Sequence, residues 1–135
     1  MAQYDSEVRD EPSAHISVVP KSTYVPAQSN PEQDRYFFAY TIVIRNDGAV
    51  PAKLISRHWI ITHGNGRVEE VQGEGVVGEQ PRLEPGETFR YTSAAMIETS
   101  LGAMHGSYQM KTDDGAGFDA EIPPFRLAAG SDVVH

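Results

Sequence analysis

The chain has 135 residues, of which 39% are hydrophobic and 22% are charged, a size and composition typical of one soluble globular domain. It has no cysteine, which excludes disulfide bonds, thiolate catalysis and cysteine-ligated zinc. Its formal net charge is −8 and its cations form no basic run, so neither a nucleic acid nor a membrane surface is expected as a partner.

Residues 1–12 are expected to form a flexible acidic tail, with four carboxylates against the single cation Arg9 and Pro12 at its end. This segment lacks the basic start and apolar run of a signal peptide, and no stretch in the chain approaches the roughly 20 apolar residues of a membrane span. The cytoplasm is therefore the expected compartment.

The following residues alternate between apolar and polar side chains with a period of two, the pattern of β-strands. The strongest example begins at Tyr36 and ends at a turn over residues 46–48. Its apolar set is predicted to face the core and consists of Tyr36, Phe38, Tyr40, Ile42 and Ile44. Phe37 points the other way, so a second apolar face is expected to be covered by the first strand or a loop, or offered to a partner or a second copy of the chain.

The strand over residues 54–63 is predicted to place Trp59 and Ile61 on one face and Leu54 and Ile60 on the other, before a hairpin turn at residues 64–66. Residues 94–103 are the only candidate for a helix and are interpreted as an irregular crossover with about one turn. The remaining predicted strands cover residues 15–19, 67–71, 87–93, 104–111 and 118–122.

About seven short strands with regular turn signals predict an all-β fold, an immunoglobulin or fibronectin type III-like β-sandwich. The domain is expected to span residues 13–128. Residues 129–135 are expected to form a flexible C-terminal tail.

The segment QGEGVVGEQP spells G-x-G-x-x-G with Gly73, Gly75 and Gly78. In a dinucleotide-binding fold this motif opens a helix, but Pro81 and Pro85 leave no room for one here. Three interpretations stay open: positive φ angles in a long connection, a protein contact, and a phosphate-binding loop.

The protein-contact interpretation uses Val76 and Val77 as apolar anchors at the tip of this loop. The phosphate interpretation uses Arg82, the one cation between Gly73 and Glu87, against four glutamates. A polyphosphate at this loop would therefore need help from Arg57, Arg67 or a metal ion.

No catalytic residue is predicted, because the chain has no G-x-S-x-G or H-E-x-x-H motif and no cysteine nucleophile. No metal site is predicted either, since His58 and His63 are five residues apart and face opposite sides of a strand, and His105 could reach them only from another strand. The turn Asp113-Asp114-Gly115 would attract Mg²⁺ only loosely.

Three segments resemble the ApaG family, also called CorD: RYFFAYTIVIRNDGAVPAKLISRHWIITHGNG, QGEGVVGEQPRLEPGETFRYTS and GSYQMKTDDGAGFDAEIPPFRL. The resemblance covers about residues 13–128 and implies a fibronectin-like β-sandwich. The family is bacterial and associated with cobalt and magnesium homeostasis, and related domains in some F-box proteins and in a DNA-polymerase-delta-interacting protein look like interaction modules. The resemblance carries no catalytic residue over to this chain, and a pyrophosphate-binding role has been suggested for the glycine motif.

The sequence therefore predicts a non-enzymatic binding module with an unidentified protein partner, existing as a monomer or weak dimer. The alternative is a binder of a phosphorylated small molecule, a nucleotide or pyrophosphate, through Gly73–Gly78 and Arg82. In that case a divalent cation, Mg²⁺ or Co²⁺, could take part. The two hypotheses differ in whether the glycine loop itself holds the ligand.

Overall fold

The computed structural model describes residues 14–130, so the predicted N-terminal tail and residues 131–135 of the predicted C-terminal tail lie outside it. The described chain folds into eight β-strands and two single-turn 3-10 helices. The strands are β1 (Ile16–Tyr24), β2 (Tyr36–Asn46), β3 (Ala52–His63), β4 (Val68–Glu74), β5 (Arg82–Leu83), β6 (Thr88–Ile97), β7 (Leu101–Thr112) and β8 (Gly117–Ala128), and the 3-10 helices are η2 (Pro26–Gln28) and η3 (Pro31–Gln33).

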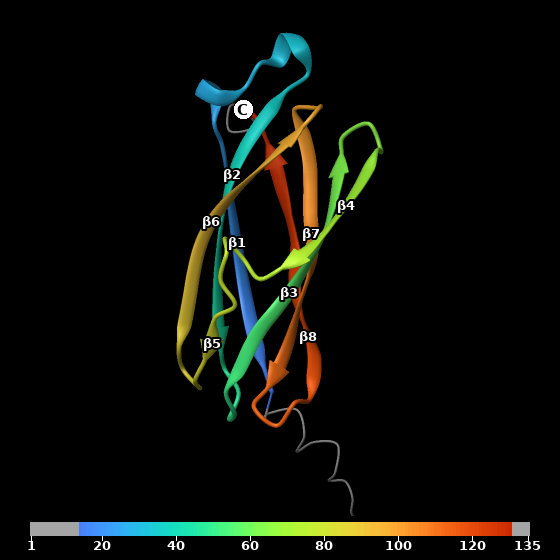
Figure 1. Cartoon of the computed structure of the whole chain (residues 1–135). Helices are drawn as coiled ribbons and strands as arrows, with labels where there is room; N and C mark the ends of the chain where they lie inside the picture. The colour runs from blue at the N-terminus through green and yellow to red at the C-terminus, as the bar shows by residue number, and fades with distance from the viewer. Residues whose placement is uncertain (1–13, 131–135) are drawn as a thin grey trace, which may run out of the picture.

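The strands form two antiparallel sheets that pack face to face (Figure 1). The smaller sheet has the order β1-β2-β6 and the larger has the order β4-β3-β7-β8, with β5 pairing to the start of β3. The predicted all-β sandwich is confirmed. There are eight strands where about seven were predicted, because two residues of the glycine-rich connection, Arg82 and Leu83, pair with Lys53 and Ala52.

The core lies between the sheets, and β2 supplies its centre. Phe38, Ile42 and Ile44 are fully buried and Tyr40 nearly so, which confirms the predicted inward face of this strand. The opposite face is not covered by β1, which pairs beside β2 in the plane of the sheet. That outer face exposes apolar side chains at both margins, including Val19 at 60% and Met96 at 46%.

The prediction for Leu54 was wrong. Leu54 is 1% exposed and faces the core together with Trp59, although the two residues are an odd number of positions apart. The cause is a shift in the β3–β7 register between Leu54 and Ser56. Such a bulge adds one residue to a strand, and every side chain beyond it then changes face.

The predicted crossover over residues 94–103 is also wrong. Strand β6 continues to Ile97 and β7 begins at Leu101, with only bends between them and no helical turn. Residues 94–97 pair with residues 36–39 of β2. The backbone hydrogen bonds of that ladder and the burial of Ile97 therefore outweigh the helical propensity of the two alanines.

The two sides of the sandwich differ. On one side β1 lies against β8, where the Ser22 hydroxyl donates a 2.6 Å hydrogen bond to the carbonyl of Arg126. On the other side lie β4 and β6, each of which pairs with a single neighbouring strand. The chain that leaves β4 crosses this open side before it reaches β5 (Figure 1). The open side carries the candidate site.

Candidate functional site

The β4–β6 groove is defined as two adjoining hollows on the open side of the sandwich, of about 280 and 210 Å³. Both are lined by Tyr40, Arg57, Trp59 and Ser93, so these residues lie where the hollows meet. The first hollow extends to residues 76–78 of the glycine loop. The second extends past Val71 of β4 and Met96 of β6, and polar and apolar groups contribute about equally to its lining.

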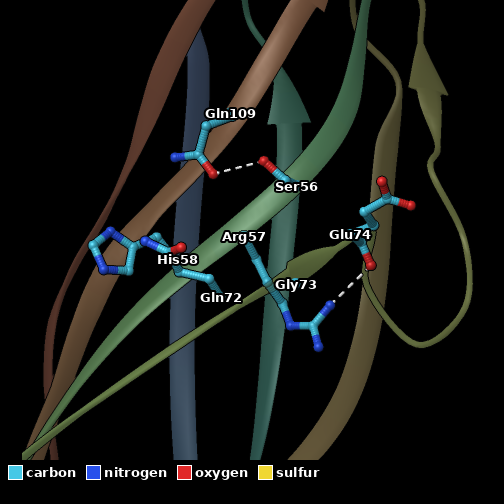
Figure 2. Close-up of a pocket in the computed structure, with 7 residues that line it drawn as sticks. All are labelled: Ser56, Arg57, His58, Gln72, Gly73, Glu74 and Gln109. Atoms are coloured by element: carbon cyan, nitrogen blue, oxygen red, sulfur yellow. Dashed lines mark hydrogen bonds between the residues drawn. The ribbon is translucent and has the colours of Figure 1, made fainter.

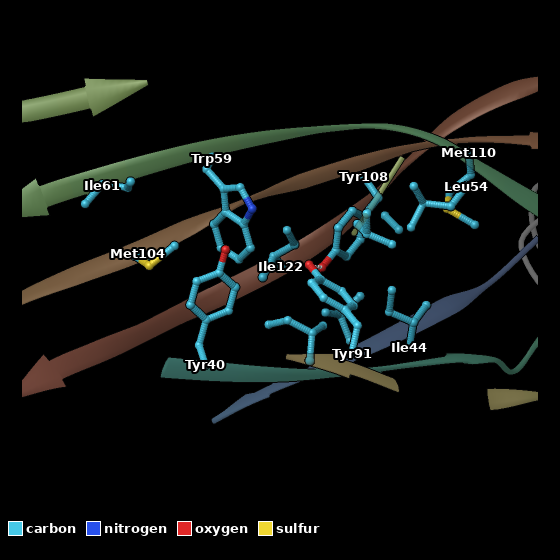
Figure 3. Packing of buried hydrophobic residues seen from close by; sticks show 14 of the residues in the cluster. Tyr40, Ile44, Leu54, Trp59, Ile61, Tyr91, Met104, Tyr108, Met110 and Ile122 are labelled. Carbon is cyan, nitrogen blue, oxygen red and sulfur yellow. Dashed lines mark hydrogen bonds between the residues drawn. The ribbon is translucent and has the colours of Figure 1, made fainter. Parts of the chain in front are cut away.

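Aromatic side chains form the floor of the groove. The rings of Tyr40 and Trp59 meet edge to face with their centroids 5.4 Å apart. Deeper in, the hydroxyls of Tyr91 and Tyr108 form a 2.6 Å hydrogen bond (Figure 3). Burial raises the pKa of both phenols far above the ordinary value, because the charged form would lose its water. The floor is thus aromatic, and its two buried hydroxyls stay uncharged at neutral pH.

Arg57 places a positive charge in this aromatic setting. It lies opposite Tyr108 of β7 and Gly73 of β4 in the sheet, and since paired residues share a face, its side chain points inward. Its Nη1 atom donates to the backbone carbonyls of Glu74, at 2.9 Å, and Gly75, at 2.8 Å. Figure 2 shows the guanidinium held at the Glu74 carbonyl while the Glu74 carboxylate points away.

A guanidinium has five N–H donors, and the two on Nη1 are used by these carbonyls. Within residues 14–130, the Nε and Nη2 atoms of Arg57 have no hydrogen-bond acceptor and no carboxylate lies within 4.0 Å of the group. Burial raises the pKa of Tyr40, and the hydrogen bond with Ser93 and the charge of Arg57 offset only part of that rise. The arrangement can therefore receive an anionic group at the centre of the groove.

Gly73 makes room for this guanidinium. It lies within β4, which runs to Glu74 and is longer than the predicted strand over residues 67–71. A Cβ atom at Gly73 would lie 2.7 Å from Nη2 of Arg57. Gly73 has no positive φ angle, so the first glycine of the motif serves the packing of Arg57.

The other two glycines shape a tight turn. Gly75 and Gly78 have φ angles of +64° and +83°, which agrees with the interpretation that they permit positive φ. Val76 and Glu79 exchange two backbone hydrogen bonds around Val77 and Gly78, the pattern of a two-residue hairpin. The amide of Gly75 donates to the Ile55 carbonyl. Three amides of the loop are therefore already bonded, which leaves few of the donors that a phosphate site uses.

The two valines of the loop have different roles. Val76 is 1% exposed and belongs to the core, so it is no surface anchor. Val77 is 54% exposed and has a φ angle of +42°, a conformation that β-branched residues strongly disfavour. Buried Val76 fixes the loop against the sandwich, and Val77 projects beside the first hollow of the groove.

Arg82 lies on β5, away from the residues that line the groove. It forms a forked pair with Asp113, at 2.6 and 3.0 Å, and a 2.7 Å bond with Glu84. These bonds raise the pKa of Arg82 and lower that of Asp113. Two other cations were considered for a phosphate. Arg67 forms ion pairs with Glu69 and Glu98, while Arg57 donates a hydrogen bond to the Gly75 carbonyl of the glycine loop.

Alternation along β3 could have identified Arg57, which stands two positions before the core residue Trp59 and must share its face. The contributions of Tyr40 and Ser93 could not be found this way. They come from the other sheet, and their approach depends on how the two sheets pack.

His63 is buried, and both of its ring nitrogens form hydrogen bonds with neighbouring residues. Its Nδ1 accepts the Glu98 amide at 3.1 Å, so Nε2 carries the proton and donates to Glu69 at 3.0 Å. His58 lies on the opposite face of β3, as alternation predicted, with its Nε2 3.7 Å from a Glu70 oxygen. No group of three or more His, Cys, Asp or Glu residues that could hold a metal ion is found in the described part of the chain.

Comparisons of the sequence and of the structure with known proteins agree on one family. The ApaG domain model matches residues 26–112. A protein named ApaG from Azoarcus sp. strain BH72 is 63% identical over 113 residues, covering 84% of this chain and 89% of the relative. The crystal structure of a Bordetella pertussis protein named ApaA is 50% identical and superposes with a TM-score of 0.84, covering 87% of this chain and 95% of that one. No helix in residues 14–130 is long and apolar enough to cross a membrane.

Proposed function

The chain belongs to the ApaG family, and from this membership and the geometry of its open side we propose that it is a non-enzymatic binding module. In this proposal a partner protein docks an extended segment into the β4–β6 groove, where the segment pairs with β6 as an additional strand. The observation that carries the proposal is the composition of β1, β4, β6 and β8, the four strands at the sheet edges that are longer than the two-residue strand β5.

Three of these edge strands contain residues that discourage further pairing. Strand β1 contains Pro20, β8 contains Pro123 and Pro124, and β4 contains three glutamates and a glycine in seven residues. The fourth edge is different, since residues 91–97 of β6 read YTSAAMI, with no charge, proline or glycine. An open, uncharged edge of this length is suited to strand addition.

The backbone register identifies which groups on β6 are available. The amide of Asn46 donates to the carbonyl of Glu87, which defines a hydrogen-bonded pair. Pairs alternate along an antiparallel ladder, so the backbone groups of Thr92, Ala94 and Met96 point away from β2. In the described structure no backbone bond reaches that edge of β6. These three residues would pair with the incoming segment.

The chemistry of the groove supports binding without catalysis. With raised pKa values, Tyr91 and Tyr108 stay protonated at neutral pH and cannot act as bases. The alternative, a phosphorylated ligand held by the glycine loop, is less well supported because three of the loop amides are already bonded. Whether Mg²⁺ or Co²⁺ takes part, and whether the chain is a monomer or weak dimer, remain predictions.

Site-specific photo-crosslinking in the native cell tests the docking site. A photoreactive amino acid at Thr92 or Met96 should produce one discrete cross-linked product, because both side chains border the edge where the segment would lie. The same probe at Asp119, which is exposed on β8, is the control and should give none. An identical pattern from Asp119, or no product from either β6 position, would contradict the proposal.

A further inference from the structure

We infer that Arg57 determines the specificity of the β4–β6 groove by binding the carboxylate of an aspartate or glutamate side chain in the docked segment. This inference rests on the proposed function and adds the chemistry of the ligand. The site consists of the Arg57 guanidinium, the aromatic walls beside it and the free edge of β6.

The guanidinium is held in place but is not neutralised. Its two bonds to the carbonyls of Glu74 and Gly75 fix its position, and Gly73 leaves the space that it fills. Its Nε and one Nη2 hydrogen lie on the same edge of the planar group, the fork that binds both oxygens of a carboxylate. Within residues 14–130 no carboxylate occupies that fork.

The surroundings increase the strength of such a contact. Arg57 is partly buried and lies where the two hollows meet, next to Tyr40 and Trp59. An ion pair in a partly desolvated groove is screened less by water and salt than one on an open surface. An incoming carboxylate would also supply the partner that a partly buried cation otherwise lacks.

The charge of the rim favours a carboxylate over a phosphoryl group. Glu74 lines the first hollow, Glu79 follows the tip of the loop, and the whole chain carries a net charge of −8. A phosphoryl group carries nearly twice the charge of a carboxylate at neutral pH, so these glutamates repel it more strongly. A single carboxylate still satisfies the fork of Arg57.

The shape of the groove determines which positions of the docked segment are expected to be apolar and which acidic. In a strand paired with β6, every second side chain points into the groove, and positions two apart are about 6.8 Å apart. On either side of Arg57 the groove has an apolar wall, formed by Val77 in one direction and by Val71 with the inward-facing Ala95 in the other. The expected ligand is therefore apolar-x-acidic-x-apolar.

The test uses the full chain, labelled with ¹⁵N, and two synthetic peptides with blocked ends, TVTETVT and TVTQTVT. The glutamate peptide should shift the amides of Thr92, Ala94 and Met96 together with the Arg57 Nε–H signal. The glutamine peptide should bind about tenfold more weakly or worse, because it loses a charge-assisted hydrogen-bond pair.

Variants then assign the effect to Arg57. Arg57→Gln should remove the difference between the two peptides, and Arg57→Lys should restore only part of it because lysine lacks the fork. Gly73→Ala keeps every charge and displaces the guanidinium, so it should also reduce the difference. Arg90→Gln removes an exposed cation from the outer face of β6. This control variant should leave the difference between the two peptides unchanged. The amide spectrum of each variant reports whether the sandwich is intact.

The outcomes separate this inference from the proposed function. Equal binding of both peptides with shifts along β6 would overturn the role of Arg57 and leave the docking edge standing. No shift along β6 with either peptide would overturn both. A larger Arg57 shift with a phosphoserine version of the peptide, or with inorganic pyrophosphate, would overturn the choice of a carboxylate.

Discussion

The two strands that border the groove, β4 and β6, differ in composition and in how they are anchored. Strand β4 carries three glutamates, and its inward Val71 remains 40% exposed. Strand β6 is uncharged from residue 91 to 97 and is anchored by Tyr91 and Ile97, which are both buried. Strand β4, with its glutamates, is thus peripheral, and β6 is firmly held.

Under the proposed function, this difference would let the open side bind a segment without aggregating. Glutamates on β4 would repel each other if two copies met along that edge, which discourages unspecific pairing. A well-anchored β6 presents its backbone groups in a fixed register, and a fixed template lowers the entropy lost when a segment pairs with it. Selectivity would then come from the groove between the two strands.

The difference in anchoring between β4 and β6 predicts the largest effect, a difference in the free energy of unfolding. Ile97→Ala should lower the free energy of unfolding by about 3 kcal/mol, because it opens a cavity at a side chain that is 1% exposed. Val71→Ala on β4 should cost less than about 1 kcal/mol, since that side chain already contacts water. Urea unfolding of both variants measures the difference, and equal losses would show that β4 is anchored as firmly as β6.

The buried tyrosine pair that anchors β6 predicts a loss of stability in alkali. The pKa of Tyr91 and Tyr108 is raised above the ordinary 10.0, chiefly by burial. Above about pH 10 the unfolded chain loses these protons while the folded chain keeps them, so stability falls as pH rises, by at most about 1.4 kcal/mol per pH unit for each tyrosine. Stability is unaffected by this pair below that pH.

Unfolding free energies measured by urea from about pH 8 to pH 11 test this dependence. Tyr91→Phe removes one of the two ionisations and the 2.6 Å hydroxyl bond. It should lower stability at neutral pH by about 1 kcal/mol and flatten the alkaline slope. An unchanged slope in this variant would mean that the loss of stability arises elsewhere.

The smallest effect concerns individual amides and leaves stability unchanged. Thr92 and Ala94 should exchange their amide hydrogens about tenfold faster than Ser93, because the first two point to the free edge and the third bonds to β2. In β4 the same alternation should make Glu70 and Gln72 fast. Hydrogen exchange followed by NMR checks both strands, and a reversed alternation in β6 would contradict the docking register.

Much of the fold was predictable from local patterns. Period-two alternation placed Phe38, Ile42 and Ile44 in the core, and the turn at residues 64–66 was found because glycine and asparagine adopt positive φ readily. The error at Leu54 shows the limit of this reasoning. Alternation assumes an unbroken strand, and the bulge that breaks it is a property of the β3–β7 pairing.

The glycine motif shows the same limit at the candidate site. Gly75 and Gly78 have the positive φ angles that a glycine-rich turn suggests, and this much is local. The role of Gly73 depends on Arg57, sixteen positions earlier, whose guanidinium occupies the space of its missing side chain. Arg82, the cation nearest the motif in sequence, is instead engaged by Asp113 across a distant turn.

The sequence alone determined the all-β class, the inward face of most strands and the family, because these follow from side-chain periodicity, turn chemistry and sequence similarity. The tertiary structure alone decided that β6 is an open edge, that Val76 is buried while Val77 is exposed, and that Arg57 meets the glycine loop. These features depend on the order of strands in each sheet and on the packing of one sheet against the other. Both arise from contacts between residues far apart in the chain, which no local pattern encodes.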